Sequence, residues 1–139
     1  MKNNEITESQ KQRAFEAAKT IRFVRLIGME MVELRDSEAI FKLEMREDLR
    51  QPHGLLHGGA TASLIDTAMA FAVITCLTED EKASMVDLTI HYLRPVINGT
   101  IFCTAKIVKA GKRLLTVSAE VVSDQGKLIA TALSTYSKV

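Results

Sequence analysis

The stretch HGGATASLIDTAMAFAVITCLT, residues 57–78, decides the fold of this chain. It begins with a pair of glycines and continues through good helix formers, nearly all of them apolar. A helix that is apolar around most of its circumference has to be buried. The stretch therefore predicts a central helix over about residues 59–77, with the rest of a single domain packed around it. The 139 residues suffice for one such domain with its own core.

Asp66 is the only formally charged residue between Gln51 and Thr78. An unpaired carboxylate on a buried helix costs free energy, so such a residue usually has a hydrogen-bond partner or a chemical task. We therefore take Asp66 as the first candidate for catalysis. The alternative is a structural aspartate whose oxygens accept hydrogen bonds from a hydroxyl or a backbone amide.

Strand-like segments flank the helix on both sides. Alternating side chains and turn residues predict strands over 26–34, 38–45, 84–91, 101–109, 114–123 and 128–137. Residues 1–25 form an N-terminal extension with a polar helix over about 9–19. The predicted class is α+β, with an antiparallel sheet of five or six strands wrapped around the helix. An open edge strand would pair with a second copy, so we expect a dimer with a continuous sheet.

Composition and charge exclude several classes of protein. A net charge of +1 gives no reason to expect nucleic acid. Asp66 interrupts the longest apolar run, and the first residues lack the apolar stretch of a signal peptide, so we expect a cytoplasmic protein without a membrane segment. Cys76 and Cys103 lack CxxC spacing and are expected to be free thiols.

Three common kinds of site are also excluded. His53 and His57 are four residues apart, but Gly54 lies between them and no acidic third ligand has suitable spacing, so no metal is expected. The chain also lacks a GxSxG nucleophile motif and a phosphate-binding GxxxxGK motif.

The glycine pair lies where a loop becomes the central helix. Amides of a first helical turn have no partner within the helix, and the helix dipole adds partial positive charge there. The Gly58 N–H could therefore stabilise negative charge on a substrate carbonyl, with His57 and Gly59 as neighbouring substrate-binding residues. The alternative is that the glycines only permit a tight turn.

Spacing also relates the glycine to the acid. Gly58 and Asp66 are eight residues apart, which is about 12 Å along a helix. Groups that act on one reacting carbon must approach it to about 3–3.5 Å. Gly58 of one subunit would therefore have to meet Asp66 of another, as antiparallel helices about a two-fold axis allow. Catalysis by these two residues implies a dimer.

Two further polar residues are candidates. Alternation along its strand places Ser84 with Val86, Leu88 and Ile90 on the side that faces the helix. Its hydroxyl could hold a water molecule against Asp66, or simply bond a neighbouring carbonyl. Gln51, in the loop before the glycine pair, could donate its amide to a substrate oxygen.

These residues together resemble a known family. The resemblance rests on QPHGLLHGG at 51–59, Leu64-Ile65-Asp66, Ser84 and VDLTIHYLRP at 86–95. From about Gly28 onward, the chain resembles the PaaI-type acyl-CoA thioesterases of the hotdog-fold superfamily. The resemblance implies a sheet wrapped around the central helix, homodimers that often pair into tetramers, and hydrolysis of acyl-CoA to a free acid and CoA.

The resemblance also implies roles for single residues. Asp66 would act as general base or nucleophile on the thioester, the Gly58 amide would polarise its carbonyl, and the Ser84 hydroxyl would help to position the attacking water. The family often has asparagine at the position of Gln51, although relatives that act on aromatic acyl-CoAs can carry glutamine there. Its sites combine the loop and helix start of one subunit with the acid of the other.

This chemistry needs no cofactor, because coenzyme A is part of the substrate. Partial burial should raise the pKa of Asp66 and make it a better base, although hydrogen bonds from Ser84 would oppose the shift. Basic residues near strand ends could meet the phosphates of coenzyme A, although exposed basic turns are usually only solvated. These residues are Arg94, Lys109, Lys112 and Arg113.

Two other functions stay open. A hotdog 3-hydroxyacyl thioester dehydratase would need a histidine and an acid together, whereas His57 lies at the far end of the helix from Asp66 within one chain. A non-catalytic acyl-CoA binding or sensing module is the second alternative, because a fold does not fix a function.

Overall fold

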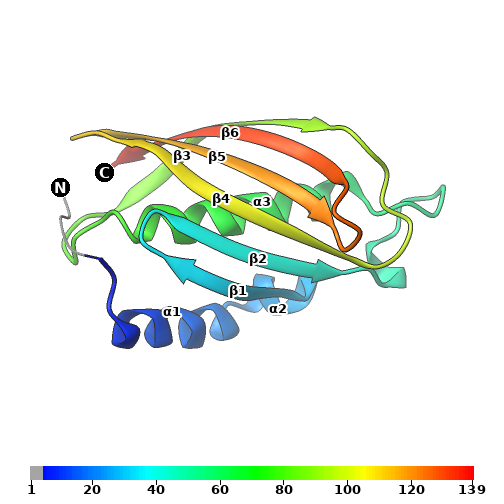
Figure 1. The fold of residues 1–139 in the computed structure, drawn as a ribbon, viewed down its shortest axis with the longest axis horizontal. Helices are drawn as coiled ribbons and strands as arrows, with labels where there is room; N and C mark the ends of the chain where they lie inside the picture. The colour runs from blue at the N-terminus through cyan, green and yellow to red at the C-terminus, as the bar shows by residue number, and fades with distance from the viewer. Residues whose placement is uncertain (1–4) are drawn as a thin grey trace.

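One antiparallel sheet of six strands packs around a long helix in the computed structural model, which describes residues 5–139 (Figure 1). The elements in chain order are α1 (Glu8–Thr20), α2 (Arg22–Ile27), β1 (Met29–Arg35), β2 (Glu38–Glu44), the 3-10 turn η1 (Glu47–Leu49), α3 (Gly58–Ile74), β3 (Ala83–Tyr92), β4 (Thr100–Ala110), β5 (Leu114–Ser123) and β6 (Leu128–Lys138). The predicted α+β class and all six predicted strands are confirmed.

The strand order in the sheet is β1-β2-β4-β5-β6-β3, with every neighbouring pair antiparallel. Strands β4, β5 and β6 form a meander, and β3 pairs with β6 at the far side of the sheet. Strands β1 and β3 are the two edges. The β3 edge is ten residues long, and its outer row of backbone groups can pair with another strand.

Helix α3 supplies the centre of the core because apolar side chains surround most of its circumference. It contacts β1, β2, β3, β4 and β5, and Leu64, Ile65 and Met69 are completely buried. The helix ends at Ile74, three residues earlier than predicted. The hydroxyl of Thr75 donates to the carbonyl of Ala72 at 2.7 Å, which favours termination there.

Helix α2 replaces the start of the strand that was predicted from residue 26. Gly28 caps the C-terminal end of this helix: its φ of +90° favours glycine, and its amide donates to the Val24 carbonyl at 2.9 Å. The Arg46 guanidinium donates to the carbonyls of Leu26 and Ile27. A helix of six residues is too short for apolar periodicity to distinguish it from a strand.

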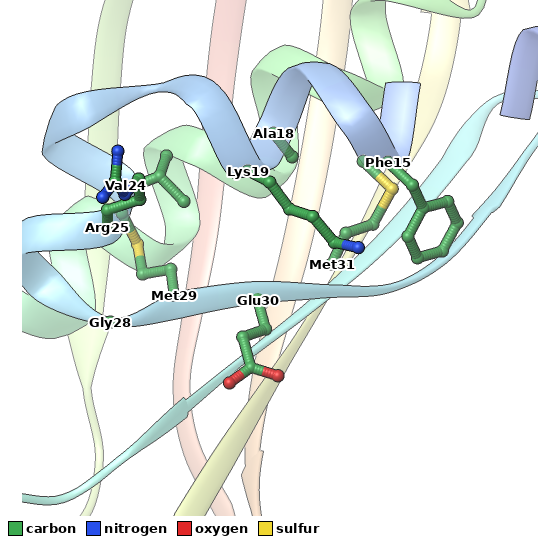
Figure 2. A pocket seen from close by; sticks show the side chains of 9 residues that line it. All are labelled: Phe15, Ala18, Lys19, Val24, Arg25, Gly28, Met29, Glu30 and Met31. Carbon is green, nitrogen blue, oxygen red and sulfur yellow. The ribbon is translucent and has the colours of Figure 1, made fainter. Parts of the chain in front are cut away.

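The N-terminal helices pack onto the edge strand β1 (Figure 1). A hollow of about 450 Å³ lies between them, and Phe15, Met29 and Met31 are among its apolar lining residues (Figure 2). The predicted extension is thus part of the fold from residue 5, and its residues 1–4 lie outside the described part of the chain. Over residues 5–139, no helix has the length and apolar character needed to span a bilayer.

Candidate active site

The start of α3 presents one free backbone donor. His57 is the N-cap, and its Nδ1 accepts from the Gly59 amide at 2.8 Å, while its carbonyl accepts from the Ala60 amide at 2.9 Å. The amide of Gly58, by contrast, has no acceptor among residues 5–139. It is an unpaired N–H at the positive end of a 17-residue helix.

Tyr92 fixes this helix start against the end of β3. Its hydroxyl donates to the Gly58 carbonyl at 2.9 Å, and a Cβ added to Gly58 would lie 3.4–3.5 Å from the ring. An alanine Cβ would therefore fit in ordinary van der Waals contact with the tyrosine, and neither this contact nor backbone strain requires glycine at position 58. The contact of Tyr92 with Gly58 spans 34 residues of sequence and leaves no local pattern, so Tyr92 was not predicted as part of the site.

A hollow of about 260 Å³ adjoins Gly58 and brings three of the predicted residues together: Gln51, Gly58 and Arg94. The side-chain oxygen of Gln51 accepts from the His53 amide, which leaves the two N–H donors of Gln51 for another acceptor. Arg94 is held at the rim because its Nη1 donates to the Leu128 carbonyl at 2.9 Å. This first half-site, defined by Gln51, Gly58 and Arg94, offers donors and one positive charge.

Asp66 lies in a different hollow, of about 400 Å³, lined by residues of α2, α3 and β3. The side chain of Asp66 is exposed in the single chain. Among residues 5–139, no hydrogen bond or ion pair holds its carboxylate. Asp66 is therefore not the hydrogen-bonded structural aspartate of the alternative interpretation. Desolvation by the surrounding protein still raises the pKa of Asp66 above its ordinary value. We call this hollow with its acid the second half-site.

Asp66 lies in an unpacked stripe along α3, a row of side chains that no other part of the chain covers completely. Gly59 and Ile74, at the two ends of the helix, are exposed as well, with half-buried Ser63 and Ala70 between them. These positions recur every three or four residues and so share one face of the helix. The expectation of a mostly buried helix is correct, but the acid lies on its one open face.

Tyr136 of β6 is a second residue that the sequence analysis did not single out. Its side chain is only 4% exposed, and its hydroxyl has no hydrogen-bond partner among residues 5–139. Burial raises the pKa of Tyr136, and the negative charge of Asp66 raises it further.

Ser84 does not lie where alternation along the strand predicted. The pairing of β3 with β6 shifts register between Met85 and Asp87, which makes Val86 the extra residue of a bulge. The bulge reverses the side-chain alternation, so Met85 packs against the core with Leu88, whereas Ser84 and Val86 are exposed. The prediction of an inward-facing Ser84 hydroxyl was wrong.

The basic residues separate into two groups. Arg94 belongs to the first half-site. The other three, Lys109, Lys112 and Arg113, lie at or beside the turn between β4 and β5. That turn hydrogen-bonds to Lys138, which pairs with Ala83 at the start of β3, whereas Gly58 contacts Tyr92 at the opposite end of β3. One chain therefore does not bring this group to the first half-site.

Within one chain the two half-sites stay apart. Gly58 and Asp66 both belong to α3, and eight residues of helix separate them, or about 12 Å along the axis. They open into different hollows with no lining residue in common. One half offers hydrogen-bond donors to an oxygen, and the other offers a carboxylate of raised proton affinity.

Comparison with known proteins gives consistent matches. The family model described as the Thioesterase superfamily matches residues 53–130, a span that includes Gly58 and Asp66. Acyl-coenzyme A thioesterase 13 from Homo sapiens is 30% identical over 128 residues, covering 90% of this chain and 91% of that protein. Acyl-coenzyme A thioesterase PaaI from Escherichia coli is 29% identical over 107 residues, covering 76% and 74%.

The fold agrees with these matches. A variant of the phenylacetic acid degradation protein PaaI from Thermus thermophilus has a solved structure that matches with a TM-score of 0.80 at 30% identity, covering 86% of this chain and 100% of that one. The sheet around one central helix is the hotdog fold, as the resemblance implied.

Proposed function

The chain belongs to the Thioesterase superfamily, and we propose that it hydrolyses acyl-coenzyme A thioesters to a free acid and coenzyme A. The observation that carries this proposal is the pair of unsatisfied groups on one helix: the free Gly58 amide and the unpaired Asp66 carboxylate of raised pKa. The names of the human and E. coli relatives support the same substrate class.

The proposed mechanism uses both half-sites on one thioester. The carbonyl oxygen accepts from the Gly58 N–H, which stabilises the negative charge that develops there. Asp66 takes a proton from a water molecule, whose oxygen adds to the carbonyl carbon. The tetrahedral intermediate then collapses, the C–S bond breaks, and coenzyme A leaves and receives the proton. A direct attack by the Asp66 carboxylate is the alternative first step.

We propose that each site is shared between two subunits, since about 12 Å of helix separates Gly58 from Asp66 in one chain. Two features support this arrangement. The open edge of β3 can extend the sheet into a second copy, and the unpacked stripe of α3 carries Asp66 on the face that a partner helix could cover. The family resemblance adds that such dimers pair into tetramers.

Antiparallel pairing of β3 with its copy would also give the remaining candidates a place. The start of β3 in one subunit would then lie beside the end of β3 in the other. The Ser84 hydroxyl and the basic β4–β5 turn, which lie at the start of β3, would approach Gly58 and Arg94 of the other subunit. In this arrangement the basic residues could meet the phosphates of coenzyme A.

Release of free thiol from a panel of acyl-CoA substrates tests the proposed function. We expect the purified protein to release coenzyme A catalytically and the Asp66→Asn variant to lose this activity. Tight binding of acyl-CoA without thiol release would instead indicate a binding or sensing module. Interconversion of 2-enoyl and 3-hydroxyacyl thioesters without thiol release would indicate a dehydratase.

A further inference from the structure

The wall of the second half-site includes a residue from the N-terminal extension. Phe23 of α2 lines the Asp66 hollow together with Leu88 of β3 and the α3 residues around the acid. The acid half of the site is thus built from three separate elements. Its lining residues are Phe23, Ala62, Ser63, Asp66, Thr67 and Leu88.

The chemistry of this hollow is apolar apart from one carboxylate and two small hydroxyls. Phe23 is 51% exposed, so an apolar group placed in the hollow would remove much of its ring from water. A thioester presents this combination: a reacting carbonyl that must approach the acid, followed directly by the first carbons of the acyl group.

Helix α2 holds Phe23 in a defined position although the helix has only six residues. The adjacent Val24 is buried in the core, and the last turn is tied to Arg46 through the carbonyls of Leu26 and Ile27. These contacts hold the backbone that carries Phe23 beside the Asp66 hollow.

We propose that Phe23 is a specificity-determining residue, whose ring contacts the apolar acyl group of the substrate beside Asp66. This inference rests on the proposed thioesterase function and adds its substrate class, namely acyl groups that carry an apolar chain or ring. It also assigns a function to α2, which lies outside the span that the family model matches.

The test compares Phe23→Ala with wild type on acetyl-, hexanoyl-, octanoyl- and phenylacetyl-CoA. The quantity measured is the ratio of kcat/KM for each longer acyl group to kcat/KM for acetyl-CoA. Because both values come from one preparation, partial unfolding of the variant cancels in the ratio. We expect the ratios to fall at least about tenfold, the usual scale for a lost apolar contact in a substrate pocket.

Leu26→Ala is the matched control, since Leu26 lies on the same helix and is 67% exposed but does not line the Asp66 hollow. Leu26→Ala should leave the kcat/KM ratios unchanged. Phe23→Leu keeps an apolar side chain and should lower the ratios less than Phe23→Ala does. Unchanged ratios in Phe23→Ala, or an equal fall in Leu26→Ala, would overturn the assignment. Absence of thiol release by the wild type would instead refute the proposed function itself.

Discussion

Replacement of Asp66 by asparagine should separate the chemical role of this residue from its effect on stability. Asparagine keeps the size and polarity of the side chain but cannot accept a proton from water. We expect turnover to fall at least about a hundredfold, the usual scale for loss of a general base. This corresponds to about 2.7 kcal/mol of lost transition-state stabilisation.

The same variant should be more stable than wild type at neutral pH. The pKa of Asp66 is raised in the folded protein by desolvation, so the folded state binds this proton more tightly than the unfolded state does. Stability is therefore lost as the pH rises from the ordinary value of 3.8 through the raised value. Asparagine does not ionise, so the gain should be present at pH 7 and vanish below about pH 3.8.

Two measurements on purified wild type and Asp66→Asn check these expectations. Thiol release at saturating acyl-CoA gives turnover, and urea unfolding at pH 7 and at low pH gives the free energy of unfolding. The wild-type rate should also begin to fall, as the pH is lowered, at a higher pH than an ordinary aspartate would give. A folded variant that keeps more than about a tenth of wild-type turnover would refute the role of Asp66 as the base.

Two further predictions concern stability. Tyr136→Phe removes a buried hydroxyl without a partner and should raise the free energy of unfolding by about 1 kcal/mol; a clear decrease in urea unfolding would contradict this. A hydrogen bond from Lys138 Nζ and one from the Thr78 amide hold the pKa of Glu81 at about 2. The stability that the ionised Glu81 carboxylate contributes through these hydrogen bonds should be present above pH 4.5 and lost as the pH falls toward 2. Glu81→Gln should therefore be less stable than wild type at pH 7, by a margin that shrinks over that range.

The sequence predicted the fold well because long periodic segments determine it. The apolar run at 57–78 has the length and composition of a buried helix, and the segments on both sides have the alternation of strands. Helix α2 was missed because six residues carry too little periodicity.

The site was predicted less completely because its geometry depends on contacts between distant residues. Gly58 and Asp66 could be recognised from a glycine pair at a helix start and from a lone charge in an apolar run. The bulge at Val86 reversed the orientation of Ser84, and bulges leave no reliable sign in a sequence. Tyr92 lies 34 residues after Gly58, and only the folded chain brings its hydroxyl to the Gly58 carbonyl.

Mixing two inactive variants shows whether each active site takes residues from two subunits. Gly58→Pro removes the amide donor, and the helix start should tolerate it. Gly58 is the first helical residue, a position that suits proline, and His57 before it is extended. Gly58→Ala keeps the amide and is the matched control, expected to remain active. Asp66→Asn carries the complementary defect.

Each variant alone should be inactive, whereas a heterodimer should contain one site with both defects and one site with neither. Subunit exchange at equal concentrations should therefore restore about a quarter of wild-type activity, because half of the dimers are then mixed and each has one of its two sites intact. Isolated heterodimers that remain folded but release no thiol would contradict the shared site and require one chain to supply both Gly58 and Asp66.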